Sequence, residues 1–429
     1  NTFTGKNITL NILLNWPFLL SFSGLVFLIG LLSGLYPAFY LSSFRPIWVL
    51  RMGIKRTHNR GITRKILVVT QFTISIALII GTLFIFKQLE YLKKADTGFA
   101  RENIIVIPID RTPIISQYKT FKNEILNNPM VKHVTTMDYI FGTAYNTHEF
   151  RPEGYPENEW QFYPCLVVDH DFVKTFDLKI LAGRDYNEAN KTDAVKGIII
   201  NKAMVDHLGW ESPQSAIGKK FNSLQGQERV IGVIDNFNAT SLHKASGPFV
   251  LNIKETPGAI AWFMNYLAIR VNPGEYNELL EYLENQWNIF VKDRPFEYSF
   301  LDQELDNLYH DERNLSRLSL IFTILVIIIS SLGLFGLAAF MTEKRTKEMG
   351  IRKVLGAKSF DIIRIMSVEF IQLMLIANII AWPVAYFVLK GWLKNFAYQA
   401  DLSILVFVLS GLFALFLALL VTSAKTIQT

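Results

Sequence analysis

The sequence predicts an α-helical transmembrane protein with a large α+β extracytoplasmic domain between two stalk-forming transmembrane helices. Half of the 429 residues are hydrophobic and 19% are charged, which suits a membrane protein with a sizeable aqueous part. Long apolar runs lie towards both ends of the chain, and a segment of mixed composition lies between them. Basic residues gather in the short segments that separate the apolar runs. These three observations together predict the fold class.

Five apolar runs are long enough to cross a membrane, whose hydrocarbon core of about 30 Å needs roughly 20 helical residues. A single run of this kind could be a buried helix of a soluble protein, but five in one chain make that interpretation weak. The runs lie at residues 17–41, 66–86, 318–341, 362–389 and 402–422.

The basic residues of the short loops predict the orientation of the chain. Loop 42–65 has seven Lys and Arg and no acidic residue, and loop 342–361 has six against three acids. Both loops should therefore be cytoplasmic, and the segment between the second and third spans should lie outside. Residues 87–312 contain 23 basic and 32 acidic side chains, a net charge of −9, whereas the whole chain has a net charge of +6. This distribution favours anionic lipid or a cytoplasmic partner over nucleic acid.

The outer segment has the pattern of a folded α+β domain. Strand-like apolar runs alternate with amphipathic helical runs, which favours βαβ units. A part at about 143–228 is rich in Gly, Pro, Asn and aromatic residues and is predicted as an inserted subdomain. Residues 86–99 prolong the second span, and the helical pattern of 301–322 runs without a break into the third, which predicts a paired stalk. The predicted strands are 101–109, 131–139, 228–237, 248–253, 266–271 and 296–300, and the predicted helices are 115–128 and 276–291.

The charged segment TEKRTKEMGIRKVLGAKSFDII, residues 342–363, lies between two apolar runs and has the pattern of an exposed helix. Two Glu residues precede a Lys or Arg by four positions, an arrangement that stabilises a helix by roughly 0.2–0.5 kcal/mol per pair. Ile351, Val354 and Leu355 share one face at helical spacing. Gly356 is predicted to end the helix because glycine readily adopts the left-handed conformation, and Gly350 suggests a bend or a close backbone approach. The pattern alone leaves two readings open: a loop that only sets topology, or a surface helix that binds a partner.

Polar residues within the spans point to helix packing rather than to an ion-coupled carrier. Such carriers place ionisable residues near the middle of the membrane, and none is found there in these spans. Gln71 and Ser75 are interpreted as parts of helix-packing surfaces. Glu369 lies near the end of its span and is interpreted as paired with a neighbouring base, Arg364 or Arg352.

The sequence shows no enzyme motif. It has no G-x-x-x-x-G-K-[ST] phosphate loop, since the GKK at 218–220 lacks the preceding glycine, so ATP hydrolysis is expected in another chain. The single Cys165 excludes an internal disulfide. Asp169, His170 and Asp171 form a candidate metal cluster, but no further ligand lies near them in the sequence and a structural role is favoured. We expect no catalytic residue, no cofactor and no metal.

The charged segment resembles a known signature. KRTKEMGIRKVLGAKSFDII is similar to that of FtsX-like permeases, the membrane subunits of MacB-type ABC transporters. GIIINKAMVDHLGW and RVIGVIDNFNATSLH resemble the extracytoplasmic domain of these permeases, and SSLGLFGLAAF resembles the following span. The resemblance covers most of the chain and is closest in kind to the large two-half permeases of Bacteroidota.

The resemblance implies a domain organisation, because such a permease half has four spans with its outer domain between the first and second. The chain is accordingly expected to be a fragment of a longer protein, cut at both ends. The implied parts are the last span of a preceding half (1–41), a cytoplasmic loop (42–64), the first span of the second half (65–86), a MacB-like periplasmic domain with stalk (87–317), and an FtsX-like permease domain with three spans (318–423).

The resemblance also implies a function in the inner membrane. A separate cytoplasmic ATPase dimer would drive movement of the periplasmic domain (mechanotransmission), for efflux or export of a drug, peptide or lipoprotein-like substrate. A periplasmic adaptor and an outer-membrane channel are further implied partners. A scaffold that activates cell-wall hydrolases, as FtsX proteins do, and a membrane receptor remain alternatives.

Within this reading, residues 343–358 are implied to be a coupling helix that docks on the ATPase. A transient docking surface of this kind needs charge complementarity more than apolar area. The residues that match the family pattern are Glu343, Arg345, Glu348, Gly350, Arg352, Lys353, Gly356 and Ala357.

Overall fold

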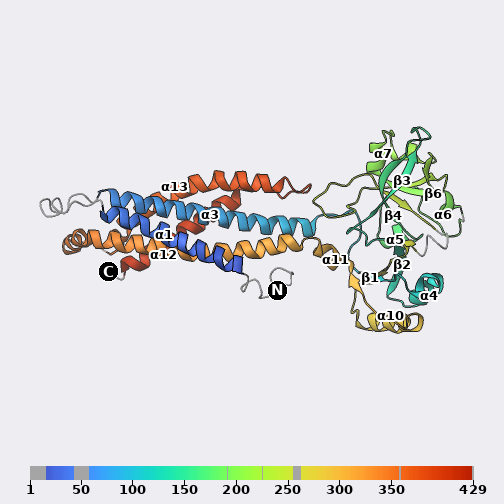
Figure 1. The fold of residues 1–429 in the computed structure, drawn as a ribbon, viewed down its shortest axis with the longest axis horizontal. Coiled ribbons are helices and arrows are strands. Elements are labelled where there is room, and N and C mark those ends of the chain that lie inside the picture. The colour runs from blue at the N-terminus through green and yellow to red at the C-terminus, as the bar shows by residue number, and fades with distance from the viewer. Residues whose placement is uncertain are drawn as a thin grey trace. The chain divides into compact units, whose positions relative to one another are not determined.

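The chain divides into a helical unit and an α+β domain (Figure 1). The computed structural model describes residues 16–42, 58–190, 192–224, 226–254, 262–356 and 359–427. The helical unit comprises residues 1–86, 313–390 and 402–429. The α+β domain comprises residues 87–312 together with the short segment Gly391–Asp401.

The long helices confirm the predicted membrane spans in four cases. Four stretches are long and apolar enough to cross a membrane: Arg64–Lys94, His310–Glu343, Ser367–Leu393 and Ile404–Ala424. A shorter apolar stretch, Trp16–Leu31, lies at the position of the first predicted run. The helices that contain these stretches are α1 (Trp16–Ser42), α3 (His58–Lys94), α12 (His310–Val354), α13 (Ser359–Leu393) and α14 (Ile404–Ile427).

The predicted stalk is continuous on one side and interrupted on the other. Helix α3 extends past its apolar part to Lys94, as predicted. The chain then turns at Gly98, where φ is +81° and an added Cβ would lie 2.4 Å from the Asn236 carbonyl oxygen, so only glycine fits. The unbroken helix predicted for 301–322 is wrong, because α11 (Leu301–Asn307) ends before α12 begins. Tyr309 lies in the intervening turn, where its side chain is buried in a cluster separate from that of α11.

A four-stranded antiparallel sheet contains both ends of the α+β domain. Its strand order is β11-β1-β10-β2, so β10 lies between β1 and β2, and β1 lies between β10 and β11. The predicted βαβ units are therefore present in split form, β1-α4-β2 and β10-α10-β11, interleaved as in a ferredoxin-like arrangement. The elements are β1 (Ile104–Pro108), η2 (Pro113–Ile115), α4 (Tyr118–Leu126), β2 (Val131–Met137), β10 (Tyr266–Val271), α10 (Asn277–Phe290) and β11 (Ser299–Phe300).

A seven-stranded mixed sheet is inserted between β2 and β10. Its strand order is β5-β8-β6-β9-β4-β3-β7. Since β8 and β9 belong to it, the inserted part extends beyond the predicted range of 143–228. Its elements are β3 (Asn146–Pro152), β4 (Gln161–Val167), α5 (Phe172–Thr175), β5 (Ile180–Gly183), α6 (Asp193–Lys196), β6 (Gly197–Asn201), α7 (Lys202–His207), α8 (Pro213–Ala216), β7 (Phe221–Ser223), β8 (Arg229–Ile234) and β9 (Val250–Asn252).

Strand alternation builds the layers of the domain, because successive side chains point to opposite faces of a sheet. In β1, Ile105 and Ile107 pack in a cluster with α4 and α10, whereas Ile104 and Val106 pack in a second cluster. In β6, Ile199 belongs to that same second cluster. The two sheets therefore share one apolar core, and each has helices on its other face, α4 and α10 on one side and α7 and α8 on the other.

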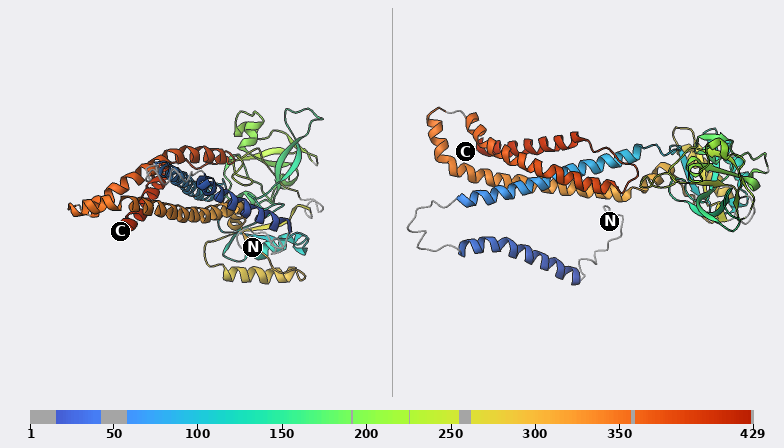
Figure 2. Two further views of the ribbon diagram at one scale, coloured as in Figure 1. Left: turned by 60° about the vertical axis from the view of Figure 1, so that its left-hand side comes forward. Right: turned by 90° about the horizontal axis from the view of Figure 1, so that it is seen from above.

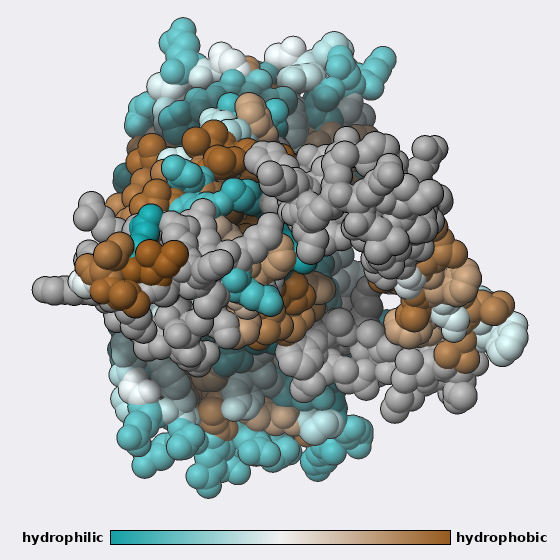
Figure 3. Space-filling model, turned by 90° about the vertical axis from the view of Figure 1, so that its left-hand side faces the viewer, coloured by the Kyte–Doolittle hydropathy of each residue, from teal (hydrophilic) through white to brown (hydrophobic). Residues whose placement is uncertain are grey.

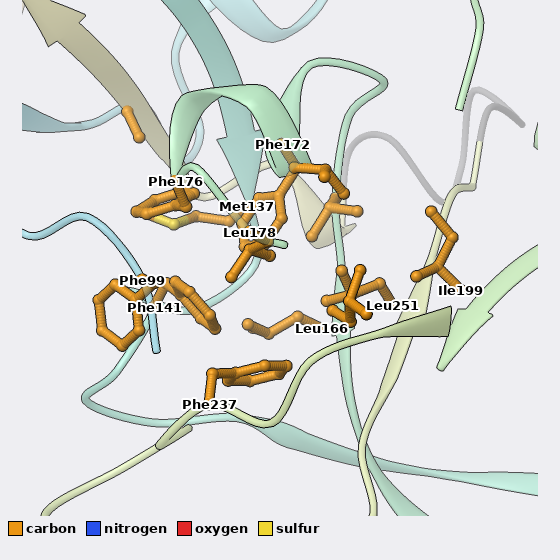
Figure 4. Close-up of a cluster of buried hydrophobic side chains, with 14 of the residues drawn as sticks. Phe99, Met137, Phe141, Leu166, Phe172, Phe176, Leu178, Ile199, Phe237 and Leu251 are labelled. Atoms are coloured by element: carbon orange, nitrogen blue, oxygen red, sulfur yellow. The ribbon is translucent and has the colours of Figure 1, made fainter. Parts of the chain in front are cut away.

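The shared core centres on phenylalanine rings (Figure 4). Phe141 is fully buried. Its ring centroid lies 4.3 Å from that of Phe99, 4.9 Å from that of Phe176 and 5.0 Å from that of Phe237. Phe99, Phe141 and Phe237 lie in separate loops and Phe176 directly follows α5, so the rings hold together segments that are far apart in the sequence.

Candidate functional site

The charged segment forms the last part of α12. This helix runs without interruption from His310 to Val354, so Glu343–Val354 continues the apolar span. Gly350 lies inside the helix and does not end it. The charged segment and the apolar span are thus parts of one helix.

The predicted docking residues lie along the end of this helix and just beyond it. Glu343 and Arg352 are exposed, and Gly356 is exposed after the last turn. The structure describes only the helical backbone of Arg345, Glu348, Gly350 and Lys353, and Ala357 lies outside the described residues.

Three large apolar side chains are exposed at the same helix end. Ile351 is 57% exposed, Val354 88% and Leu355 80%. The Leu355 amide donates to the Ile351 carbonyl oxygen over 3.0 Å, which completes the last turn. Gly356 follows with φ of +91°, so the predicted glycine terminator is confirmed. Apolar side chains that remain exposed together are typical of a binding surface. Figure 3 shows patches of hydrophobic side chains on the face that lies at the left-hand side of Figure 1.

Paired hydroxyls join α12 to α3 inside the apolar part of the helical unit. Ser75 Oγ lies 2.7 Å from Ser330 Oγ, and Thr82 Oγ1 lies 2.8 Å from Thr323 Oγ1, with all four side chains buried. Thr82 follows Ser75 by seven residues in α3, whereas Thr323 precedes Ser330 by seven residues in α12. The two helices are therefore antiparallel neighbours (Figure 2). Interhelical hydroxyl contacts of this kind stabilise helix association in lipid.

Small and polar residues pack along the same seam. The Gln71 side chain fills the space above Gly333, where an added Cβ would lie 2.5 Å from Gln71 Oε1. The packing role predicted for Gln71 and Ser75 is thus confirmed. The described surroundings of Gly336 are open, with nothing within 4 Å of an added Cβ.

Glu369 of α13 forms an ion pair with Lys65 of α3. Its carboxylate is 19% exposed and the Lys65 side chain is 40% exposed. The prediction that a base pairs with Glu369 is correct in kind, but the partner comes from a different helix. The sequence offered no signal for Lys65, because the pairing depends on how α3 packs against α13.

In the candidate metal cluster of the domain, the two carboxylates pair with a lysine side chain. Lys122 Nζ lies 2.8 Å from Asp169 Oδ2 and 2.7 Å from Asp171 Oδ2, and the Tyr118 hydroxyl donates to Asp169 over 2.6 Å. Burial alone would raise the pKa of Asp169, but the His170 hydrogen bond and the Lys122 charge lower it overall. Among the described residues no group of three His, Cys, Asp or Glu is arranged to hold a metal ion. The cluster is a buried ion pair that joins α4 to the inserted part.

The sequence of the helical unit matches one family. Residues 320–427 match the family described as FtsX-like permease C-terminal. This part of the chain is similar to an FtsX-like permease domain. The matched residues begin within α12 and end at the last residue of α14, so the match includes the charged segment and the helices that flank it. No curated protein matches the chain.

Three solved structures match about half of the chain at low sequence identity. The chain is similar to the periplasmic region of MacB from Actinobacillus actinomycetemcomitans, with 10% identity over 49% of this chain and 94% of that one, at a TM-score of 0.34. It is also similar to a domain of a permease protein from Porphyromonas gingivalis, with 17% identity over 47% and 91% and a TM-score of 0.32. The extracellular domain of the noncanonic ABC-type transporter YknZ from Gram-positive bacteria matches with 14% identity over 46% and 97% and a TM-score of 0.31.

One segment within residues 320–427 was not predicted to belong to the α+β domain. Gly391–Asp401 connects α13 to α14 and belongs to the α+β domain, although the predicted domain ended at residue 317. Its aromatic residues Trp392, Phe396 and Tyr398 are the one signal in the sequence that could have pointed to packing there.

Proposed function

We propose that the chain is the permease subunit of a MacB/FtsX-type ABC transporter. A separate cytoplasmic ATPase dimer docks on the end of α12 and moves the α+β domain, which lies in the periplasm. The transporter exports a drug, peptide or lipoprotein-like substrate, with a periplasmic adaptor and an outer-membrane channel as further partners. The observation that supports this most is the FtsX-like permease match over residues 320–427.

The geometry of α12 supports the coupling part of the proposal. The charged end and the apolar span form one helix, so ATPase-driven movement at Arg352 would reach Ser330 and Thr323 without a hinge. Those hydroxyls contact α3, and α3 leads into the α+β domain at Lys87. The exposed Ile351, Val354 and Leu355 side chains add apolar area to a basic docking surface.

Charge reversal of the helix end tests the docking. The variant Arg352→Glu with Lys353→Glu is expected to lose co-purification with the ATPase because complementary charge becomes repulsive. The matched control, Lys132→Glu with Lys196→Glu, changes the charge by the same amount on exposed positions of the domain and should keep the partner. Normal co-purification of the first variant would overturn the docking assignment.

A second variant separates docking from membrane topology, because basic residues also set orientation. Val354→Ser with Leu355→Ser leaves the charge unchanged and removes exposed apolar area. It should weaken ATPase co-purification while a carboxyl-terminal topology reporter keeps its wild-type signal. If only the charge variant loses the partner, and the reporter shows inverted insertion, the segment is a topological anchor and the docking role is wrong.

A further inference from the structure

The segment between α13 and α14 is built into the α+β domain. Phe396 is 3% exposed and packs with Leu92 of α3, Leu242 and Tyr309 in one apolar cluster. Trp392 and Tyr398 pack against this cluster at its edge. A connection of about ten residues between two membrane helices would be solvent-exposed if it only linked them, so the burial of Phe396 and Ala400 within it requires another explanation.

The side chain of one glutamine, Gln88, forms two hydrogen bonds with the backbone of this segment. Gln88 of α3 is 1% exposed. Its Nε2 donates to the Tyr398 carbonyl oxygen over 2.9 Å, and its Oε1 accepts from the Ala400 amide over 2.7 Å. The side-chain amide thus pairs with a carbonyl and an N–H as a neighbouring strand would. Beside it, Lys87 Nζ donates to the Asp401 carbonyl oxygen over 2.7 Å.

The opposite side of the segment is held by the connection between β8 and β9. The Ala397 amide donates to the His243 carbonyl oxygen over 3.1 Å, and the His243 ring stacks on Phe396 at 4.5 Å between centroids. His243 Nε2 lies 2.9 Å from Glu312 Oε1 at the start of α12. The segment therefore contacts the ends of both helices that enter and leave the domain.

We infer that Gly391–Asp401 is a third connection between the permease helices and the α+β domain, and that Gln88 is its positioning residue. The inference rests on the proposed function for its mechanical meaning. Helices α13 and α14 are covalently continuous with the segment, so they cannot shift along α3 unless the Gln88 hydrogen bonds break or the domain follows. The domain then responds to α13 and α14 as well as to α3 and α12.

Hydrogen exchange on the full chain in detergent tests this without the ATPase or a substrate. In Gln88→Ala, the exchange protection of the Ala397 and Ala400 amides should fall between about 5- and 30-fold, as expected for the loss of two buried hydrogen bonds. Leu242, whose amide donates to the Tyr309 hydroxyl over 2.9 Å, should lose protection with them. Strand β1 should keep its protection.

Two further variants decide between positioning and simple loop stability. Gln399→Ala is the matched control, because Gln399 Nε2 bonds within the segment itself, to the Phe396 carbonyl oxygen over 2.9 Å; it should leave Leu242 unchanged. Gln88→Glu should behave like Gln88→Ala at pH 8, where the carboxylate cannot donate to Tyr398, and recover protection at pH 4, where the protonated acid donates and accepts as the amide does.

The outcomes are separable from those of the proposed function. Unchanged protection in Gln88→Ala, or equal loss in Gln399→Ala, would overturn the connection. Absence of rescue in Gln88→Glu at pH 4 would remove Gln88 as the positioning residue. Failure of the wild-type chain to co-purify an ATPase would contradict the proposed function alone, since the exchange experiment does not depend on that partner.

Discussion

The α+β domain and the helical unit differ in how far they expose their large apolar side chains. The domain encloses its large apolar residues, among them Phe141 and Trp287, at 0–1% exposure. The helical unit leaves Ile379 and Phe387 71% exposed and buries hydroxyls such as that of Ser75. In water, apolar burial stabilises a fold, whereas in lipid the tails are as apolar as the side chains and association depends on close packing and polar contacts. The same apolar side chain is therefore expected to contribute differently to the free energy of unfolding in the α+β domain and in the helical unit.

Truncation of one phenylalanine in each part gives the largest expected difference. Phe141→Ala should lower the unfolding free energy of the domain by about 3–5 kcal/mol, because it leaves a cavity among four rings. Phe387→Ala removes a ring that faces outward and should change stability by less than about 0.5 kcal/mol. The measurement is a urea titration of the detergent-solubilised chain, in which hydrogen-exchange protection of the β1 amides reports the unfolding. Equal midpoints for the two variants would contradict the comparison.

The sequence predicted the parts that depend on local pattern. Alternating runs gave β1, β2 and β10, apolar length gave four spans, and Gly356 was predicted because its left-handed conformation follows from local sterics. Strand order was not predictable in this way, since β10 pairs with β1 and β2 across the whole inserted sheet.

The long-range contacts of the site were missed for the same reason. Gln88 bonds to backbone groups that lie 310 and 312 positions away. Since every residue has a backbone, the sequence does not indicate which backbone groups a side chain will bind. Lys65 and Glu369 likewise meet only through helix packing. The coupling residues, in contrast, were proposed from a contiguous segment and a family resemblance, and Arg352 and Lys353 remain to be tested by substitution.

The second-largest effect on stability is expected at a buried carboxyl group in the α+β domain, and it depends on pH. Asp138 lies where the chain leaves the four-stranded sheet, and its Oδ1 accepts from the Val167 and Tyr139 amides, each over 3.1 Å. Its Oδ2 has no hydrogen-bond partner among the described residues. Burial raises the pKa of Asp138 to about 7. In the helical unit, by comparison, the half-buried carboxylate of Glu369 is paired with a lysine.

The sign of the effect follows from the raised pKa. The folded state holds the Asp138 proton up to about pH 7, whereas an unfolded aspartate loses it near pH 4. The stabilisation is therefore complete below about pH 4 and is lost as the pH rises through 7. Asp138→Asn keeps the Oδ1 acceptor and cannot ionise, so it should stabilise the domain at pH 8 by roughly 1–3 kcal/mol and match the wild type at pH 4. Thermal unfolding at both pH values measures this, with exposed Asp206→Asn as the control; a gain that is equal at both pH values would contradict the assigned ionisation.

The smallest expected effect lies in the hydroxyl seam of the helical unit. Ser75→Ala and Ser330→Ala remove a buried contact of 2.7 Å between α3 and α12, and a double-mutant cycle should give a coupling energy of about 0.6 kcal/mol, typical of polar contacts between membrane helices. Ser331→Ala is the matched control, because Ser331 donates to the Ile327 carbonyl oxygen of its own helix over 2.8 Å, and its cycle with Ser75→Ala should give no coupling. SDS-titrated unfolding in mixed micelles provides the measurement. A coupling energy of several kcal/mol would mean that this hydroxyl contact is as strong as a contact in a buried polar network. The expected difference between the helical unit and the α+β domain would then be contradicted.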